Sequence, residues 1–195
     1  GPWTESPHNP ILKATDQNGE HASNPTFVVA PDGQCRIYFK TMTQQNGEIY
    51  REISLATSDN IEGPYEVYAD NPLISYAEQQ IDIEDPYAFY YSGMYYMILE
   101  DRMNVKGMLE GTNTGKPRHG GMRPGLIYQS KDGIDWGIPK VGYLTNEIYF
   151  GHELARSERP SILWKDGKPD YLYLACHDED STAGYILKID GWEGE

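Results

Sequence analysis

The sequence predicts an all-β fold built from β-propeller blades, each blade being a small antiparallel sheet. Three observations lead to this fold class. The 195 residues include 16 Tyr, 4 Trp and 4 Phe, together with 20 Gly and 13 Pro, a composition typical of short strands joined by many turns. The chain repeats itself internally, and each repeat contains apolar runs separated by glycine turns. We therefore expect residues 1–195 to form a single domain that is part of a propeller.

Two landmarks define the repeat. Gly1-Pro2-Trp3 precedes Asn9-Pro10, and the same spacing recurs 62 residues later as Gly63-Pro64-Tyr65 and Asn71-Pro72. The second landmark is a proline after a polar residue, and it occurs three times, as Asn24-Pro25, Asp85-Pro86 and Arg159-Pro160. A unit of about 60 to 75 residues is long for a propeller blade but has the right internal order.

A β-hairpin is predicted after each of the three proline landmarks, because two apolar runs flank an Asp-Gly or Ser-Gly turn. A third run comes after each hairpin. The hairpin runs are residues 26–30 and 36–40, 87–91 and 95–99, and 161–164 and 171–175; the third runs are 53–57, 126–129 and 185–189.

These runs divide the chain into blades at residues 13–74, 75–145 and 146–195. Residues 1–12 match the segment that comes after a third strand, so we interpret them as the outer strand of a preceding blade. Residues 100–123 form a long glycine-rich loop in the second blade, and loops of this length are functional or disordered. Three blades do not close a ring. We therefore expect a homo-oligomer, or association with the missing propeller blades.

Charge and cysteine content exclude several classes of function. The formal net charge of −14 argues against nucleic acid and against anionic membrane surfaces as partners. No apolar run is long enough to span a bilayer, and no signal peptide is visible. Cys35 and Cys176 lie in apolar runs without zinc-ligand spacing, so we expect buried free thiols.

Three segments resemble a known enzyme family. They are Asp82-Ile83-Glu84-Asp85-Pro86, Ala56-Thr57-Ser58 leading to Gly63-Pro64-Tyr65, and Glu158-Arg159-Pro160. They are similar to five-bladed β-propeller glycosidases, above all glycoside hydrolase family 43 and its relatives, including family 117. The resemblance implies an exo-acting, inverting glycosidase for oligosaccharides from plant or algal polysaccharides. It favours a periplasmic or secreted bacterial protein.

The same resemblance implies roles for the carboxylates. In that family three carboxylates in the central depression act as general base, modulator of the acid's pKa, and general acid. Asp85 is similar to the modulator and Glu158 to the general acid, and Glu84 is an alternative to Asp85. Inverting hydrolysis needs an acid and a base about 6.5 to 9.5 Å apart across the sugar. The blade that normally carries the base is absent, and Asn24 cannot replace a carboxylate.

Other polar residues fall where a sugar is expected to bind. Asp101, Arg102, Lys40 and His177 follow the second strand of their blades, and His21 and Asn24 precede the first hairpin. Arg159 is a candidate for binding a uronate or sulfate, or for neutralising a neighbouring carboxylate. No cofactor is expected to be required and no metal ligands are assigned, although some family 43 members hold a central calcium ion. Tyr87, Tyr128 and Trp164 are expected in the core rather than as sugar platforms.

Two hypotheses from other functional classes stay open. In the first, the chain is a non-catalytic propeller that binds glycans. In the second, it is an assembly subunit whose incomplete blades pair with another chain through strand edges. Sibling propeller families, the fructan hydrolases and mannoside phosphorylases, share the proline landmarks preceded by acidic residues.

Overall fold

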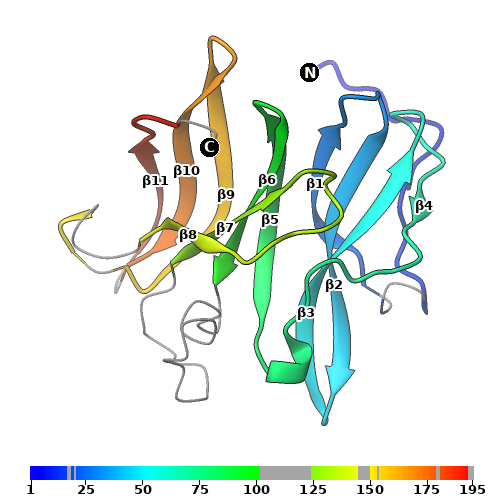
Figure 1. The fold of residues 1–195 in the computed structure, drawn as a ribbon, viewed down its shortest axis with the longest axis horizontal. Coiled ribbons are helices and arrows are strands. Elements are labelled where there is room, and N and C mark those ends of the chain that lie inside the picture. Colours follow the sequence, from blue (N-terminus) through cyan, green and yellow to red (C-terminus); the bar gives the residue numbers. More distant parts are fainter. Residues whose placement is uncertain are drawn as a thin grey trace.

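The fold is a row of three antiparallel sheets, as the ribbon of the computed structural model shows (Figure 1). The structure describes residues 1–16, 19, 21–101, 124–144, 150–152, 154–178 and 181–192. The first sheet has the order β1 (Ser23–Val29), β2 (Cys35–Gln45), β3 (Glu48–Ser58) and β4 (Glu66–Val67). The second has the order β5 (Ile83–Tyr91), β6 (Met94–Asp101), β7 (Gly125–Ser130) and β8 (Lys140–Tyr143). The third contains β9 (Arg156–Lys165), β10 (Lys168–His177) and β11 (Thr182–Lys188).

The predicted hairpins are confirmed. Each opens a sheet, and its turn contains the glycine that the sequence indicated. Ser92 and Gly93 have φ values of 49° and 87°, and Asp166 and Gly167 have 51° and 73°. Two successive left-handed residues match the twist of the flanking strands. A short 3-10 turn, η2 (Ala77–Gln79), links the first sheet to the second.

Two apolar cores lie between the sheets. Because side chains alternate across a strand, one face of the second sheet packs on the first sheet and its other face packs on the third. Tyr38 and Leu55 of the first sheet meet Met97 of the second in one core. Phe89 and Tyr96, on the opposite face of the second sheet, meet the third sheet in the other core.

Hydrogen bonds through one tight turn join the first two sheets. The Tyr38 hydroxyl donates to the carbonyl oxygen of Gly133 at 2.8 Å, and Arg36 donates to the carbonyl oxygen of Asp132. Gly133 has a φ of 73°, and a Cβ there would lie 2.5 Å from a guanidinium nitrogen of Arg36 and 2.6 Å from the Tyr38 oxygen. Only glycine therefore fits this turn without displacing its partners.

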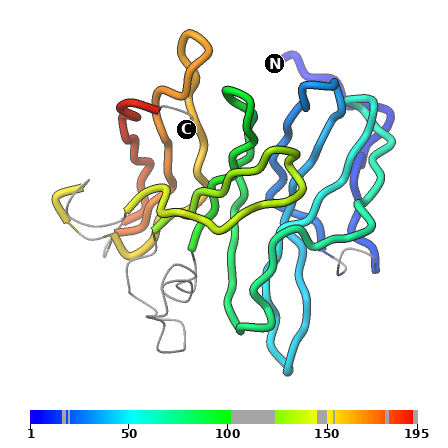
Figure 2. Tube along the Cα trace, in the orientation of Figure 1, coloured from blue at the N-terminus to red at the C-terminus, as the bar shows by residue number. Residues whose placement is uncertain are grey.

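The first twelve residues run beside the first sheet on the side away from β5 (Figure 2). They form no strand in this chain, and their predicted role as the outer strand of a preceding blade stays a prediction. Ile11 and Leu12 pack on Ile37 and Phe39, which belong to the outer face of the first sheet. The outer face of the first sheet is thus partly covered from within the chain.

Several further expectations can be compared with the described residues. Cys35 and Cys176 are both buried and free, as predicted. Tyr128 lies in the first core, and Tyr87 and Trp164 pack against the second. Most of the long loop lies outside the described residues. Among the helices of the described residues, none is long and apolar enough to cross a membrane.

Candidate active site

The three proline landmarks share one backbone conformation at the start of the innermost strands β1, β5 and β9. Asn24, Asp85 and Arg159 have φ values of 48°, 57° and 54°, and in each case the strand register shifts there. This is a β-bulge, which redirects side chains and tolerates a proline because no ladder hydrogen bond is needed at that point. The sequence therefore places three aligned bulges side by side.

Asp85 joins the three bulges to one another. The Asn24 side-chain amide donates to Oδ1 of Asp85, and the backbone N–H of Arg159 donates to Oδ2 at 3.2 Å. Asp85 is 5 % exposed. Donors from both neighbouring sheets fix this carboxylate in place. A central pocket of about 390 Å³ opens beside it, lined by residues of all three strand starts.

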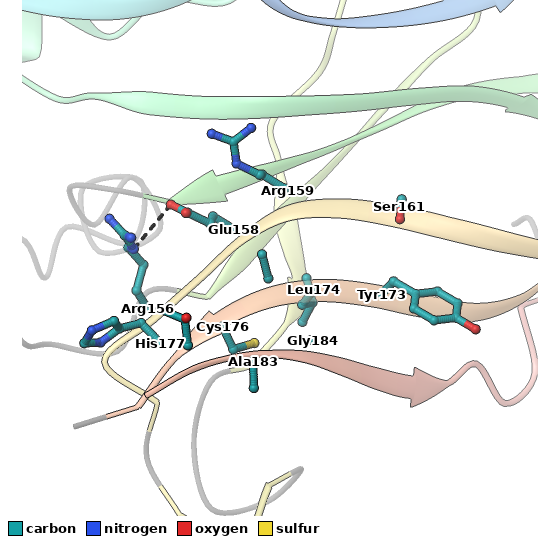
Figure 3. A pocket seen from close by; sticks show the side chains of 12 residues that line it. Arg156, Glu158, Arg159, Ser161, Tyr173, Leu174, Cys176, His177, Ala183 and Gly184 are labelled. Carbon is teal, nitrogen blue, oxygen red and sulfur yellow. Dashed lines mark ion pairs between the residues drawn. The ribbon is translucent and has the colours of Figure 1, made fainter. Parts of the chain in front are cut away.

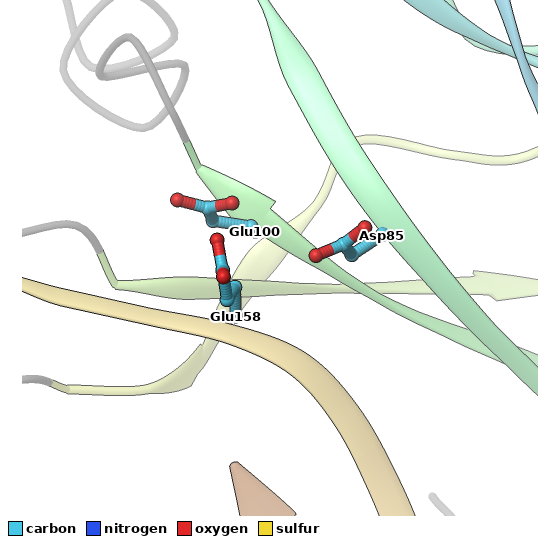
Figure 4. A group of neighbouring side chains, drawn as sticks. All are labelled: Asp85, Glu100 and Glu158. Atoms are coloured by element: carbon cyan, nitrogen blue, oxygen red, sulfur yellow. The ribbon is translucent and has the colours of Figure 1, made fainter. Parts of the chain in front are cut away.

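Three carboxylates converge next to this pocket (Figure 4). The nearest carboxylate oxygens of Asp85, Glu100 and Glu158 all lie within 4.8 Å of one another. They come from β5, β6 and β9, so the group bridges the second and third sheets. Glu100 is fully buried, whereas the side chain of Glu158 is 20 % exposed. Glu158 is therefore the member of the trio that solvent or a ligand reaches most easily.

Glu100 was not among the candidates from sequence, and strand parity explains why it reaches the site. Asp101 was predicted instead, as a sugar contact. Residues of β6 alternate, so Glu100 shares its face with Tyr96 and Ile98, which pack toward the third sheet. Asp101 lies on the opposite face and raises the pKa values of Tyr76 and Tyr128, after the larger effect of burial on both. The sequence signal that could have identified Glu100 is an acidic residue directly after the apolar run of residues 95–99.

The carboxylates of the trio affect the pKa values of neighbouring side chains. Burial raises the pKa of Tyr143 well above its usual range, and the neighbouring Glu100 and Asp85 add to the increase. Burial, with a smaller contribution from Glu158, raises the pKa of the Cys176 thiol to about 11. On the more exposed side of the trio, Arg156 forms an ion pair with Glu158, and its Nε lies 3.3 Å from Oε2.

Glu84 is directed away from the trio and into a separate ionic network. Nζ of Lys40 lies 2.5 Å from Oε1 of Glu84, and Nε of Arg51 lies 3.4 Å from Oε2. Arg51 also binds Asp82, through its guanidinium and, at 2.6 Å, through its backbone N–H. The geometry thus separates the two neighbouring acids. Asp85 joins Glu158, whereas Glu84 holds the buried Lys40, which was predicted to contact sugar.

The remaining predicted residues lie at varied positions. Burial lowers the pKa of His21, and the nearby charges of Lys40 and Arg51 lower it further; Nε2 of His21 is 2.8 Å from the Ser23 hydroxyl. A second pocket, of about 520 Å³, is lined by Glu158, Arg159 and His177 among others (Figure 3). Arg102 lies outside the described residues. The substrate-binding roles of these residues stay predictions.

The trio is also the kind of group that can ligate a metal. Within the described part of the chain it is the one cluster of at least three acidic, histidine or cysteine side chains with suitable spacing. Three carboxylates can supply oxygen ligands to a divalent cation, but calcium takes six to eight oxygens. The sequence assigned no metal ligands, and the calcium ion of some family 43 members stays an untested part of the resemblance.

Among the comparisons with known proteins, only the one with solved structures gave matches, and these support the fold. No protein-family model and no curated protein sequence matches the chain. Solved structures do. They include the Bombyx mori GH32 β-fructofuranosidase BmSUC1, with 18 % identity and a TM-score of 0.55 over 85 % of this chain and 34 % of that one. The GH43 endo-arabinanase from Bacillus licheniformis matches with 14 % identity and a TM-score of 0.53, over 88 % of this chain and 54 % of that one.

A third match comes from a structure described as showing that the GH130 family of mannoside phosphorylases contains glycoside hydrolases that target β-1,2 mannosidic linkages in Candida mannan. It has 14 % identity and a TM-score of 0.54, over 94 % of this chain and 59 % of that one. This chain thus spans between one third and three fifths of the length of these proteins. At such identities the likeness shows the fold. The chain has part of the β-propeller fold that these glycoside hydrolases share.

Proposed function

We propose that this chain supplies the general acid, and the carboxylates that tune it, of a glycoside hydrolase. The observation that carries the proposal is the convergence of Asp85, Glu100 and Glu158 within 4.8 Å, where the end of β6 meets the starts of the innermost strands β5 and β9. In this proposal Glu158 donates the proton, because it is the most exposed of the three and lines a pocket. Arg159, Asn24 and His177 stand near enough to this region to contact a sugar.

Like-charge repulsion is the physical reason for placing three carboxylates so close together. A negative charge beside a carboxyl group favours the protonated form, which is the form that a general acid needs. Asp85 accepts two hydrogen bonds from the neighbouring sheets, and these hold it in place. Asp85 and Glu100 are therefore proposed to act on Glu158 through their charge and not to contact the glycosidic oxygen.

The separation of the carboxylates argues against an acid and a base that both belong to the trio. Acid and base lie about 6.5 to 9.5 Å apart in inverting enzymes, and acid and nucleophile about 5 to 5.5 Å in retaining ones. A sugar does not fit between groups within 4.8 Å of one another. Asp85 and Glu100 are thus proposed to modulate the acid. The inverting base is proposed to face Glu158 from the far side of the substrate.

The test compares two substrate types in the variant Glu158→Gln. Losing general acid catalysis typically costs about 10²- to 10⁴-fold in rate. This loss is expected on unactivated oligosaccharides. It should be small on aryl glycosides whose leaving group needs no proton. Reducing-sugar release and chromophore release measure the two rates, across furanoside and pyranoside substrates of plant and algal origin.

Binding measurements make the experiment informative at every level of activity. Calorimetry with the same oligosaccharides should show that Glu158→Gln still binds them. Equal losses on both substrate types would show that Glu158 is not the acid. A chain that neither binds nor cleaves any of the oligosaccharides would refute the carbohydrate function itself.

A glycan-binding role without catalysis is the second candidate, and Asn24 favours it. At the bulge of β1, where the neighbouring sheet carries Asp85, an amide stands in place of a carboxylate and donates to Asp85. Binding without turnover on every substrate would support this candidate.

A further inference from the structure

A repeated contact holds each sheet to the next one in the chain. The residue after the landmark proline bonds the backbone of the next innermost strand. The Thr26 hydroxyl accepts from the N–H of Ala88 at 3.1 Å, and the Tyr87 hydroxyl donates to the carbonyl oxygen of Ile162 at 3.5 Å. Ser161 holds the same position in the third sheet, and it is exposed.

The outer face of the third sheet has the same pattern of residues as the faces that are buried between the sheets. Strand register aligns the rows: Thr26–Tyr38–Leu55 in the first sheet, Tyr87–Ile98–Ile127 in the second and Ser161–Tyr173–Ile186 in the third. The first two rows pack on the following sheet. In the third row, Tyr173 is 41 % exposed and Ile186 is 55 % exposed, with Leu163 beside them at 47 %. An apolar sheet face of this kind is a candidate docking surface.

The edge of the third sheet repeats another internal contact. In the first sheet, the Asn71 side chain bonds both the N–H and the carbonyl oxygen of Leu55 at 2.8 Å, and this fastens residues 71–74 along β3. Ile186 is the counterpart of Leu55 in the row above. Asn9 is the counterpart of Asn71 in the 62-residue repeat, and it is exposed. Residues 1–12 therefore carry the side chain that fits the edge of β11.

The N-terminal end of the molecule offers the complementary apolar surface. Trp3 is 92 % exposed, whereas Tyr65, its counterpart in the repeat, is partly buried on the cluster formed by Ile37 and its neighbours. Val29, on the outer face of the first sheet, is 52 % exposed.

The charges of the two ends also differ at the edge where the hairpin turns lie. Lys165 and Lys168 flank Asp166 on the third sheet, whereas Asp59 and Glu62 stand on the first. All of these side chains are exposed. At this edge the local charges of the last and first sheets are therefore complementary, which opposes the overall repulsion between two chains of net charge −14.

We propose that a second copy of this chain docks head to tail on the third sheet. Its residues 1–12 lie along β11 with Asn9 bonded to the backbone of Ile186, and its first sheet covers Tyr173 and Leu163. The contact repeats the two sheet-to-sheet interfaces inside the chain. The pocket beside Glu158 and Arg159 lies on the same face, so the second copy forms its missing wall.

The test is sedimentation velocity of the full chain over a range from about 1 to 200 µM, where a typical protein interface of moderate size is populated. Species of twice 22.1 kDa and of larger multiples are expected, because a head-to-tail contact leaves the third sheet of the last copy free unless the ring closes. Trp3→Ala and Ile186→Glu should each weaken the self-association by about tenfold or more, as central interface residues do. Ile138→Glu is the matched control. Ile138 is 80 % exposed but lies outside both surfaces, so this variant should associate like the unaltered chain.

A fourth variant tests the head-to-tail arrangement. Val29→Glu alters only the first sheet, so it should also weaken association, whereas a symmetric contact between two third sheets would leave it unchanged. Far-UV circular dichroism and thermal melting check that each variant is folded; exposed Trp3 in particular has no folding role to lose. A monomer at the highest concentration refutes the proposal. So does a dimer that Trp3→Ala and Ile186→Glu leave intact, or that Val29→Glu fails to weaken. None of these results depends on catalytic activity.

Discussion

Replacing Glu100 with glutamine tests whether the trio shares charge as its geometry indicates. The change keeps the size of the side chain and removes one negative charge within 4.8 Å of Glu158. With an effective dielectric constant of about 20, two unit charges at that distance repel each other by about 3.5 kcal/mol. Part of this energy is lost because the neighbouring groups respond to the charge. We expect Glu100→Gln to raise the free energy of unfolding at pH 7 by about 1 to 3 kcal/mol.

The direction of this change follows from where the three carboxylates come close together. They converge in the folded protein but not in the unfolded chain, so removing one negative charge stabilises the folded state and leaves the unfolded state nearly unaffected.

The assay is urea denaturation of the full chain at pH 7, followed by circular dichroism. Glu52→Gln is the matched control, because Glu52 is also a buried glutamate but lies on β3 and bonds Ser75. It should give no comparable gain in stability. If Glu100→Gln is no more stable than the unaltered chain, the charge-sharing argument fails.

Three further predictions concern stability and reactivity. Gly133→Ala should lower the free energy of unfolding by about 1 to 3 kcal/mol, measured by urea denaturation, because the new methyl group crowds Tyr38 at a left-handed backbone position. Glu84→Gln should cost about 3 to 5 kcal/mol, since it leaves the buried Lys40 without its closest anionic partner; a loss below about 1 kcal/mol would contradict the buried pairing. With a pKa of about 11, the Cys176 thiol should react with a disulfide reagent at pH 8 at least about a hundredfold more slowly than a free cysteine, and faster only as the pH approaches 11.

The arrangement of strands could be predicted from sequence because its signals are local. Glycine turns, alternating apolar runs and the proline landmarks each act over a few residues, and all three hairpins were found from them. The trio depends on parity and on the bulges, which are not local properties of sequence. At Glu84-Asp85 the bulge directs the two acids to different partners. One residue of offset decides that Glu100 reaches Glu158 and Asp101 does not. The pairing of Lys40 with Glu84 joins residues from different sheets, so no spacing in the sequence indicated it.

The aligned bulges of β1, β5 and β9 have a consequence for how such a site can change. Their backbone is the same at an asparagine, an aspartate and an arginine, so it is imposed by the sheets and the following proline rather than by the side chain. Each of these positions therefore accepts a different side chain while the backbone of the surrounding blade stays the same. Replacing one of these residues, for instance Asn24 with an acidic residue, changes the charge at the centre and leaves the cores between the sheets unchanged. In such a scaffold, a single substitution changes the functional group at the centre while the backbone conformation is kept.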